Sequence, residues 1–536
     1  MELKNIYDIA RVAGIDEKYI EPYGKYKAKI DLSILDELKD KKDGKLVLVT
    51  AITPTKAGEG KTTISIALHE GLRKINENSL ICLREPSLGP VFGLKGGATG
   101  GGKVTVEPSE DINLHFTGDM HALTSSINLI AAVLDNELYQ GNSLRIDPNR
   151  IVWKRAMDMN ERTLRDIRIG IGEKNGYERN GSFLITVASE LMAILCLASD
   201  EEDFVKRLKN ITVAYDEDGN RITVNDLKVS KAVMKLMKEA LKPNLVQTGE
   251  NNPALIHGGP FANIAHGCNS LIALKLGLKL SDIVVTEAGF GSDLGAEKFL
   301  DILCNAGSLK PDLVVMVATV KALKLHGGVA PTNLNEANVD ALKVGVANLK
   351  QHLENMKKYG LNPVIAFNHF ESDKEEEIDY IMSWGKENGY RISFVDGFLR
   401  GGEGSTDLAR IVKEELAKNE GNYHSIYDVN SPLKDKIETI AREIYRAEGV
   451  NYSSLAEAKL KEFEEQGFKN AYICVAKTPA SFSDNDALIN APRGFKLNVK
   501  DVSLSSGANF VVCYTGEIMT MPGLPKVPAA VKMEDQ

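Results

Sequence analysis

The sequence feature that most constrains the fold is a glycine-rich turn between an apolar run and a helical pattern. The apolar run Leu46–Thr50 is rich in β-branched residues and leads into Thr53–Thr63, which reads TPTKAGEGKTT. A strand that enters such a turn and leaves it as a helix is typical of a phosphate-binding loop (P-loop). The backbone N–H groups of the turn and the N-terminus of the helix both attract anions. We therefore expect a P-loop within an α/β fold.

Individual residues of this loop have expected roles. Lys61 should reach the β- and γ-phosphates of a nucleotide, and the Thr62 hydroxyl should ligate Mg²⁺. The loop is a variant, because Thr55 stands where the first glycine is usual. The alternative is a glycine-rich turn that binds nothing. The residues assigned to nucleotide binding are Thr53, Pro54, Thr55, Lys56, Ala57, Gly58, Glu59, Gly60, Lys61 and Thr62.

Strands and helices alternate from residue 45 onward, which predicts a mainly parallel sheet flanked by helices. Most of the strand-like runs are continuously apolar, as strands buried on both faces should be. The predicted strands are Lys45–Ile52, Ser79–Leu83, Phe183–Ala188, Asp282–Thr286, Leu313–Thr319, Val364–Asn368 and Ile392–Val395.

The length of 536 residues indicates two to three domains. We predict a P-loop domain at 1–330, with a helical N-terminal cap over residues 1–44 and a β-hairpin inserted at 211–224. Smaller α/β domains are expected at 331–470 and 471–536. Two acidic helices are expected at about 433–447 and 454–466.

Charge and apolar patterning narrow the class of partner. The formal net charge of −9 argues against general nucleic-acid binding, which needs a basic surface. No run reaches the roughly 18 apolar residues of a membrane span. The first ten residues carry no basic-then-apolar signal, so a cytoplasmic location is expected. The six cysteines form no Cys-x-x-Cys pair and are expected to be buried and reduced.

Two segments after the second predicted strand carry candidate chemistry. Arg84 follows Ser79–Leu83 at the carboxyl edge of the sheet, where ligands bind in parallel sheets. Its guanidinium could hold a carboxylate or a transferring phosphoryl group, and a surface arginine in a local ion pair is the alternative. Gly89–Gly102 is dense in glycine, which suits a loop that approaches a ligand or closes as a lid, with a plain linker as the alternative.

Three aromatic residues lie in loops at predicted strand ends. Phe290, Phe370 and Phe398 follow Asp282–Thr286, Val364–Asn368 and Ile392–Val395. An aromatic side chain in a loop often stacks on a flat ligand, although each alone could simply pack in the core. Beside a nucleotide site, the three together predict a second, planar substrate.

Several long motifs resemble those of the formate–tetrahydrofolate ligases. Gly93–Gly102 is similar to one family signature and Val317–Gly328 to another. Family blocks are also recognisable in Ile256–Ser270 and Thr515–Lys526. The resemblance runs over nearly the whole chain and its motifs are not generic to P-loop proteins.

The resemblance implies an activity and roles for the candidate residues. ATP would activate formate as formyl phosphate, and the formyl group would pass to N10 of tetrahydrofolate. Lys61 would bind the ATP phosphates and Thr62 would ligate Mg²⁺. Arg84 would bind the formyl phosphate intermediate, and Asp119 matches an acid near the reacting groups. Phe370 and Phe398 would sandwich the pterin ring, with Phe290 lining that region, so the folate pocket would fall largely in 331–470. The family is typically a homotetramer, and whether a monovalent cation activates this chain is left open.

Some positions depart from the family pattern. Phe398 stands where tryptophan is common, Glu371 where proline is frequent and Lys321 where arginine is usual, and Thr99 and Lys103 differ in the glycine-loop signature. The smaller ring of Phe398 would weaken stacking by about 1 kcal/mol. The departures bear on folate affinity and leave the ATP and formate chemistry intact.

Two other functions are compatible with the P-loop. A switch ATPase would use hydrolysis to control a protein partner, but such a domain needs about half this length and no aromatic pocket. An ATP-dependent carboxylase or ligase for another acid would share Arg84 and the loop, and only substrate tests separate it.

Overall fold

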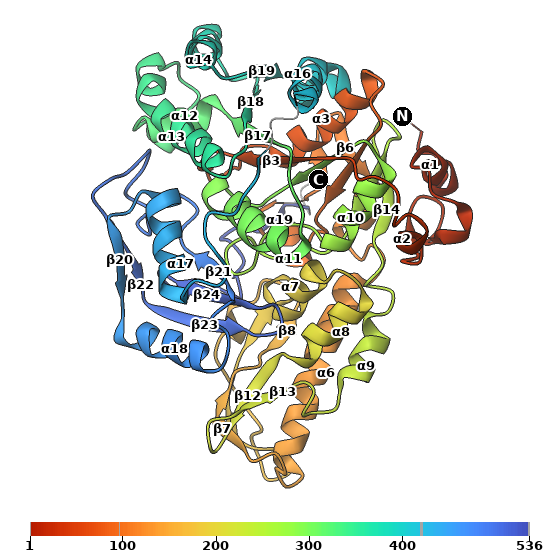
Figure 1. The fold of residues 1–536 in the computed structure, drawn as a ribbon, viewed down its shortest axis with the longest axis vertical. Helices are drawn as coiled ribbons and strands as arrows, with labels where there is room; N and C mark the ends of the chain where they lie inside the picture. The colour runs from red at the N-terminus through yellow and green to blue at the C-terminus, as the bar shows by residue number, and fades with distance from the viewer. Residues whose placement is uncertain (1, 96, 419–421, 534–536) are drawn as a thin grey trace.

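The computed structural model describes residues 2–95, 97–418 and 422–533. Gly96 of the predicted glycine loop lies outside these ranges. The described residues form a central sheet of 12 strands, with the main order β1-β2-β14-β15-β4-β16-β3-β17-β18-β19. Figure 1 shows this sheet in the upper part of the molecule, with helices packed around it.

The strands from β15 to β19 pair in parallel, in the order given above. This part confirms the predicted mainly parallel sheet. The six predicted strands within it end within one residue of the predicted ends, and β15 was not predicted. The strands are β15 (Pro253–Ile256), β4 (Ser79–Leu83), β16 (Ile283–Glu287), β3 (Lys45–Ala51), β17 (Leu313–Ala318), β18 (Pro363–Asn368) and β19 (Ile392–Val395).

Alternate residues of the central strand β3 enter two different hydrophobic cores. Leu46 and Leu48 pack in one core and Val47 and Val49 in the other, and all four side chains are buried. Because both faces are covered, the strand is apolar throughout rather than alternating. The second core includes helices α3 (Lys61–Lys74) and α16 (Thr406–Ala417), and the first includes α10 (Leu271–Leu280) and α13 (Val339–Lys358).

The prediction of a helical N-terminal cap is wrong for residues 20–30. This segment forms the hairpin β1 (Ile20–Pro22) and β2 (Ala28–Ile30), between the short helices α1 (Ile6–Val12) and α2 (Ile34–Glu37). β2 extends the sheet by pairing antiparallel with β14 (Asn244–Thr248). Pairing with a strand more than 200 residues away overrides the local polar composition, and the buried charge of Lys29 is neutralised by an ion pair with Asp119.

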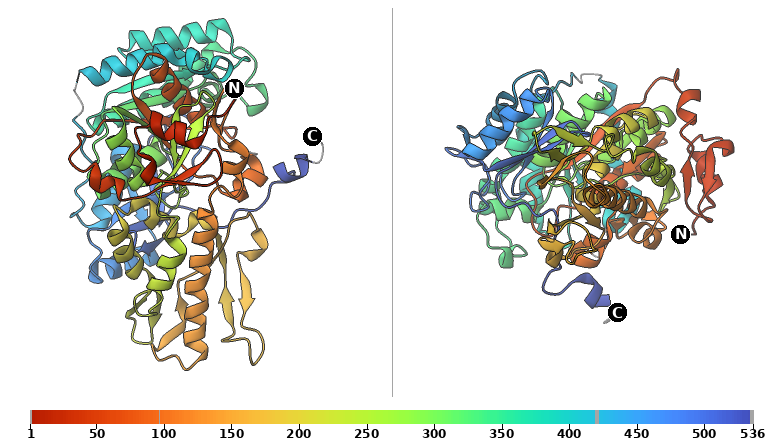
Figure 2. Two further views of the ribbon diagram at one scale, coloured as in Figure 1. Left: turned by 90° about the vertical axis from the view of Figure 1, so that its right-hand side faces the viewer. Right: turned by 90° about the horizontal axis from the view of Figure 1, so that it is seen from below.

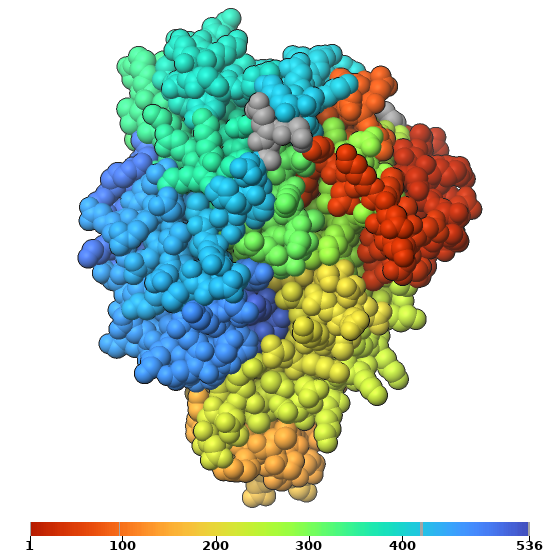
Figure 3. Space-filling view, in the orientation of Figure 1, coloured from red at the N-terminus to blue at the C-terminus, as the bar shows by residue number. Residues whose placement is uncertain are grey.

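A lobe built around the long helix α6 (Asp119–Tyr139) projects away from the sheet (Figures 1 and 3). The predicted hairpin is confirmed there, since β12 (Thr212–Asp216) pairs antiparallel with β13 (Arg221–Thr223). Phe183–Ala188 does not join the main sheet: β11 (Phe183–Ile185) pairs with β8 (Arg155–Met157) and ends in a 3₁₀ turn. The other elements of the lobe are β7 (Ile146–Ile151), β9 (Ile167–Ile169), β10 (Arg179–Gly181), α7 (Glu190–Leu197), α8 (Glu201–Lys209) and α9 (Ser230–Met237).

The C-terminal region forms a small sheet of β21 (Tyr472–Ala476), β24 (Phe510–Tyr514) and β23 (Asp501–Ser505). The predicted acidic helices are present as α17 (Leu433–Ile440), which continues as a π-helical turn to Tyr445, and α18 (Ser454–Glu465). β20 (Gly449–Tyr452) pairs with β22 (Lys496–Val499). The last helix, α19 (Ala529–Lys532), lies on an arm that leaves the body (Figure 2).

The three-domain division of the chain stays a prediction. Strand pairing crosses both of its boundaries, since β18 pairs with β17 across residue 330 and β20 pairs with β22 across residue 470. None of the helices in the described ranges combines the length and the apolar character that crossing a membrane requires.

Candidate active site

The predicted P-loop connects β3 to α3 at the carboxyl edge of the sheet. Gly58 and Gly60 have positive φ angles of 82° and 73°, a conformation that favours glycine. A Cβ atom on Gly60 would also lie 2.5 Å from Nδ2 of Asn368. The turn therefore needs both glycines, and it presents its backbone directly before the N-terminus of α3, as an anion-binding turn should.

The buried Glu59 fixes the shape of this turn. Its Oε1 accepts a 2.6 Å hydrogen bond from the Thr55 N–H, and its Oε2 accepts one from the hydroxyl of Thr319. The Glu59 carbonyl accepts a 3.0 Å bond from Nδ2 of Asn368. Thr319 follows β17 and Asn368 is the last residue of β18, so the two neighbouring strand ends hold the loop in place.

Thr62 lies against a carboxylate from the strand on the other side. Its hydroxyl is 3.0 Å from both carboxylate oxygens of Glu287, the last residue of β16. A hydroxyl and a carboxylate are the protein ligands that hold Mg²⁺ in P-loop enzymes. The sequence pointed to Thr62 for this role, and it indicated Glu287 only as a carboxylate at a strand end, with no metal role.

Two lysines share the electrostatic environment of Glu287 and Arg84. Burial lowers the pKa of the Lys61 ammonium to about 8; Glu287 and Glu59 oppose this shift, and Arg84 and Lys95 reinforce it. The side chain of Lys95 is exposed, and desolvation by neighbouring atoms together with the charge of Arg84 lowers its pKa. Lys61, Lys95 and Arg84 therefore influence one another electrostatically. Lys95 belongs to the predicted glycine loop, and sequence reasoning gave it no role.

Arg84 forms no ion pair with a carboxylate in the part of the chain that the structure describes, which argues against the local ion-pair alternative. Its Nη1 donates a 3.3 Å hydrogen bond to the carbonyl of Pro260, and its buried Nε has no partner among the described residues. The guanidinium lies against Gly289, where a Cβ atom would come within 3.2 Å of both Nη atoms. The cation is thus positioned by backbone and is available to an anionic ligand.

A cavity of about 210 Å³ lies next to the predicted P-loop. Two of the predicted aromatic residues, Phe370 and Phe398, line it together with residues of the loop. The Phe398 side chain is 50% exposed, and the Nζ of Lys321 lies 5.4 Å from the ring centroid of Phe370. An exposed ring at this place is not core packing. The lining residues are Thr55, Ala57, Gly58, Glu59, Gly60, Thr63, Thr319, Lys321, Asn368, His369, Phe370 and Phe398.

The glycine loop supports Phe398 from behind. The Lys103 N–H donates a 2.9 Å hydrogen bond to the Phe398 carbonyl, and a Cβ atom on Gly102 would lie 2.2 Å from that carbonyl oxygen. Gly101 likewise faces the ring. The end of the loop, from Gly100, is a strand pair between β5 (Gly100–Gly101) and β6 (Val104–Glu107), so this end packs against the aromatic residue rather than serving as a plain linker.

A second polar pair, missed from the sequence, lies next to these aromatic residues. Nδ1 of His369 and Oδ1 of Asp396 are 3.6 Å apart, and both atoms are buried without a hydrogen-bond partner among the described residues. They follow β18 and β19, one residue before Phe370 and two before Phe398.

Asp119 and Phe290 lie apart from the aromatic cavity. Asp119 is buried at the start of α6, where its oxygens accept hydrogen bonds from Lys29 at 2.6 and 2.7 Å and from Asn244 at 2.9 Å. Burial and the neighbouring Asp119 raise the pKa of Glu85 well above its usual range, which places Asp119 beside the residue after Arg84. Phe290, with a φ of 55°, follows Gly289 on the Arg84 side of the loop.

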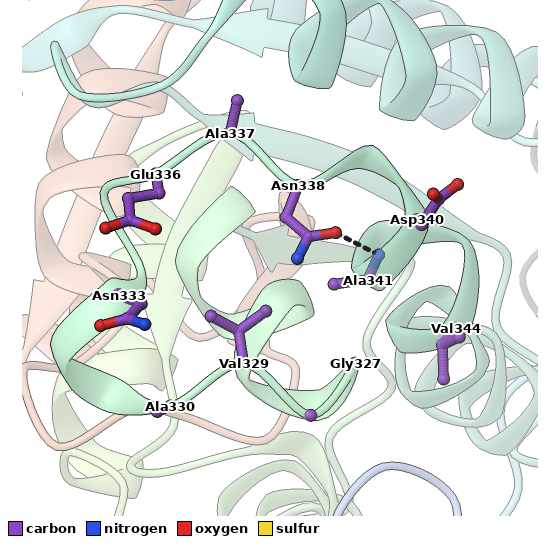
Figure 4. Close-up of a pocket in the computed structure, with 11 residues that line it drawn as sticks. Gly327, Val329, Ala330, Asn333, Glu336, Ala337, Asn338, Asp340, Ala341 and Val344 are labelled. Carbon is purple, nitrogen blue, oxygen red and sulfur yellow. Dashed lines mark hydrogen bonds between the residues drawn. The ribbon is translucent and has the colours of Figure 1, made fainter.

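A wider hollow of about 530 Å³ lies between α12 (Val320–His326) and α13, and Figure 4 shows its lining. Its rim is partly acidic, with Glu336 and Asp340, and the Asn338 side chain caps α13 through a 2.9 Å hydrogen bond from the Ala341 N–H. No predicted site residue lines this hollow.

A comparison with protein families identifies the whole chain. The family model for formate–tetrahydrofolate ligase matches residues 1–536. The match confirms the resemblance seen in the sequence motifs.

Proposed function

The chain belongs to the formate–tetrahydrofolate ligase family, and on that premise we propose that its P-loop binds ATP and that formate is activated as formyl phosphate. As a member, the chain is a ligase that joins formate to tetrahydrofolate in an ATP-dependent reaction. The observation that carries the mechanistic proposal is the contact between Thr62 and Glu287 at the end of the glycine turn, with Lys61 next to Thr62 in the chain and Arg84 directly after β4, the strand beside β16.

In the first step, a formate oxygen attacks the γ-phosphorus of ATP. The bond from the γ-phosphorus to the bridging oxygen breaks, and ADP leaves with its electron pair. Lys61 and the N–H groups of the turn hold the phosphates, while Arg84 and Lys95 neutralise the charge on the transferring group. Bound Mg²⁺ would neutralise phosphate charge further, and Thr62 and Glu287 are the residues that would hold it.

In the second step, the N10 nitrogen of tetrahydrofolate attacks the formyl carbon. Phosphate leaves with the electrons of the carbon–oxygen bond, and the nitrogen loses its proton. Phe370 and Phe398 would hold the pterin ring in the cavity beside Gly58–Gly60, which brings the folate next to the phosphate-binding turn. Formyl phosphate reacts with water, so the glycine loop that supports Phe398 would also limit solvent access.

Asp119 and Phe290 would have more limited roles than the sequence suggested. Asp119 would act next to the reacting groups through Glu85 and Arg84, since Lys29 already neutralises its charge. Phe290 would line the region between Arg84 and the folate. A homotetramer and a cytoplasmic location stay predictions that accompany the family assignment, and whether a monovalent cation activates the enzyme stays open.

The switch ATPase is the weaker candidate. It would leave the exposed Phe398 and the aromatic cavity without a ligand, and the family match spans the full chain rather than a P-loop domain alone.

The test is ADP release from MgATP in four mixtures: with formate, with tetrahydrofolate, with both, and with neither. We expect steady turnover only with both substrates, matched by 10-formyltetrahydrofolate, and no turnover for Lys61→Ala. ADP release indifferent to formate and folate would contradict the ligase mechanism. Replacing formate by acetate tests the remaining alternative, a ligase for another acid.

A further inference from the structure

Every polar group of Thr53, the first residue of the P-loop motif, is bonded to protein. The side chain is fully buried. Its N–H donates a 2.8 Å hydrogen bond to Nε2 of His352, and its carbonyl lies 3.1 Å from Nε2 of His326. Its hydroxyl accepts a 3.0 Å bond from Nδ2 of Asn348. Thr53 therefore lies beneath the loop, where it anchors the turn instead of offering groups to a ligand.

The neighbouring hydrogen bonds fix the tautomer of each imidazole. Nδ1 of His326 accepts a 3.0 Å bond from the Asn490 N–H, so its Nε2 carries the proton that is donated to Thr53. Nε2 of His352 is the acceptor for the Thr53 N–H, so its Nδ1 donates to the hydroxyl of Ser292 at 2.6 Å. Two imidazoles in opposite tautomers thus hold one peptide from both sides.

Both imidazoles are neutral at physiological pH. Burial lowers the pKa of His352 to about 3. The charge of Asp293 raises this pKa, and His326 and Lys477 lower it further. Burial also lowers the pKa of His326. The arrangement is therefore a permanent clamp across the physiological range.

The clamp is braced by a distant part of the sequence. Asn490 has a φ of 68°, its carbonyl accepts a 2.7 Å bond from Asn348, and its side chain donates a 3.0 Å bond to the Val344 carbonyl. The Phe482 ring lies 4.4 Å from the His352 ring. A buried ion pair of 2.6 Å between Lys477 and Asp293 anchors the start of this segment.

We propose that His352 and His326 are positioning residues for nucleotide binding, which hold Thr53 so that the turn glycines direct their N–H groups at the phosphates, and that residues 477–490 brace them. The inference rests on the proposed nucleotide site. The β3 ladder ends just before Thr53, so the clamp is what orients the chain as it leaves the sheet. Pre-oriented donors bind an anion without the entropic cost of ordering them.

The test measures the dissociation constant of MgADP by equilibrium dialysis on the full chain. His352→Phe keeps a ring against Phe482 but removes Nε2, which contacts both the N–H and the hydroxyl of Thr53. The N–H then keeps only the 3.3 Å bond to Asn348. The dissociation constant of this variant should rise about tenfold, the scale of a lost hydrogen bond. His352→Gln retains an acceptor near the Nε2 position and should restore binding to within about threefold of wild type. His69→Phe is the matched control: His69 is equally buried but bonds Ser79 at the start of β4. It should destabilise the fold and leave MgADP binding unchanged.

A second pair of variants changes Asn490, which is only partly buried. Asn490→Val places a β-branched residue at a φ of 68° and should displace the backbone N–H that donates a hydrogen bond to Nδ1 of His326. Asn490→Gly tolerates that φ and should bind MgADP as tightly as wild type. If His352→Phe and Asn490→Val both bind MgADP like wild type while Lys61→Ala does not, the clamp is refuted and the P-loop assignment stands. If wild type fails to bind MgADP, or Lys61→Ala binds equally well, the nucleotide site is refuted together with the clamp.

Discussion

Titration of Lys61 gives nucleotide binding a pH dependence that can be calculated. Burial lowers the pKa of this ammonium from 10.5 to about 8 in the free protein. The charged form binds phosphate, so the apparent dissociation constant of MgADP should scale with the factor 1 + 10^(pH − 8). Since the pKa is lowered and the group is a base, affinity is retained below about pH 8 and is lost above it.

The magnitude follows directly from that factor. Between about pH 7.5 and about pH 9, the factor rises from about 1.3 to about 11, so the dissociation constant should increase about eightfold. The assay is equilibrium dialysis of MgADP across this range. The β-phosphate of ADP is already ionised there, so the ligand contributes little to the slope.

Two variants separate Lys61 from its neighbours. Lys61→Arg carries a charge at every pH in this range, so it should bind more weakly but with no pH dependence. Lys95→Gln should keep the slope, because Lys61 still titrates in this variant, and a slope lost in Lys95→Gln would contradict the assignment to Lys61. An unchanged dissociation constant up to about pH 10 in wild type would refute the reasoning, as would a slope that survives in Lys61→Arg.

Four further variants test other parts of the site and the fold. Glu287→Gln should raise the Mg²⁺ concentration for half-maximal activity about tenfold, because a carboxylate that meets Thr62 at 3.0 Å is lost; an unaltered Mg²⁺ titration would remove Glu287 from the metal site. Phe398→Ala should raise the KM for tetrahydrofolate up to about tenfold and the KM for ATP much less, and equal increases would exclude Phe398 from the pterin site. Gly102→Ala should reproduce that kinetic pattern, since its Cβ atom would press on the Phe398 carbonyl at 2.2 Å; normal folate kinetics would show that the loop does not position the ring. Lys324→Met should cost about 3–5 kcal/mol in urea unfolding by stranding the buried carboxylate of Glu377, and the double variant with Glu377→Met should recover most of it; no recovery would mean that the loss does not come from the unpaired charge.

The sequence predicted what short-range patterns encode. The glycine turn between β3 and α3 was recognisable because Gly58, Gly60, Lys61 and Thr62 lie close together in the sequence, and the central strands because burial on both faces makes them continuously apolar. The segment 20–30 was misjudged because its strands owe their stability to β14, and nothing in the local composition reports that partner.

The parts of the site that could not be predicted are contacts between residues far apart in the sequence, which depend on which strands are neighbours in the sheet. Glu287 meets Thr62 only because β16 lies next to β3, and His352 meets Thr53 from a helix some 300 residues further along. A single sequence shows residue types at strand ends but not which ends are neighbours. The long family motifs supplied much of that missing information, and this is why Phe370 and Phe398 could be paired before their shared cavity was seen.

Because of the strand order, β3 is synthesised long before the two strands that pair with it. β3, which feeds the P-loop, is complete at Ala51, but the strands on either side of it begin at Ile283 and Leu313. At roughly 5–20 residues per second, the ribosome needs about 12–46 s to make the roughly 230 residues before the first partner. Throughout that interval an apolar strand has both edges unpaired, which is the condition that favours aggregation. The nascent chain is thus expected to depend on chaperones that bind near its N-terminus, and slow translation should lower the yield of active enzyme rather than raise it.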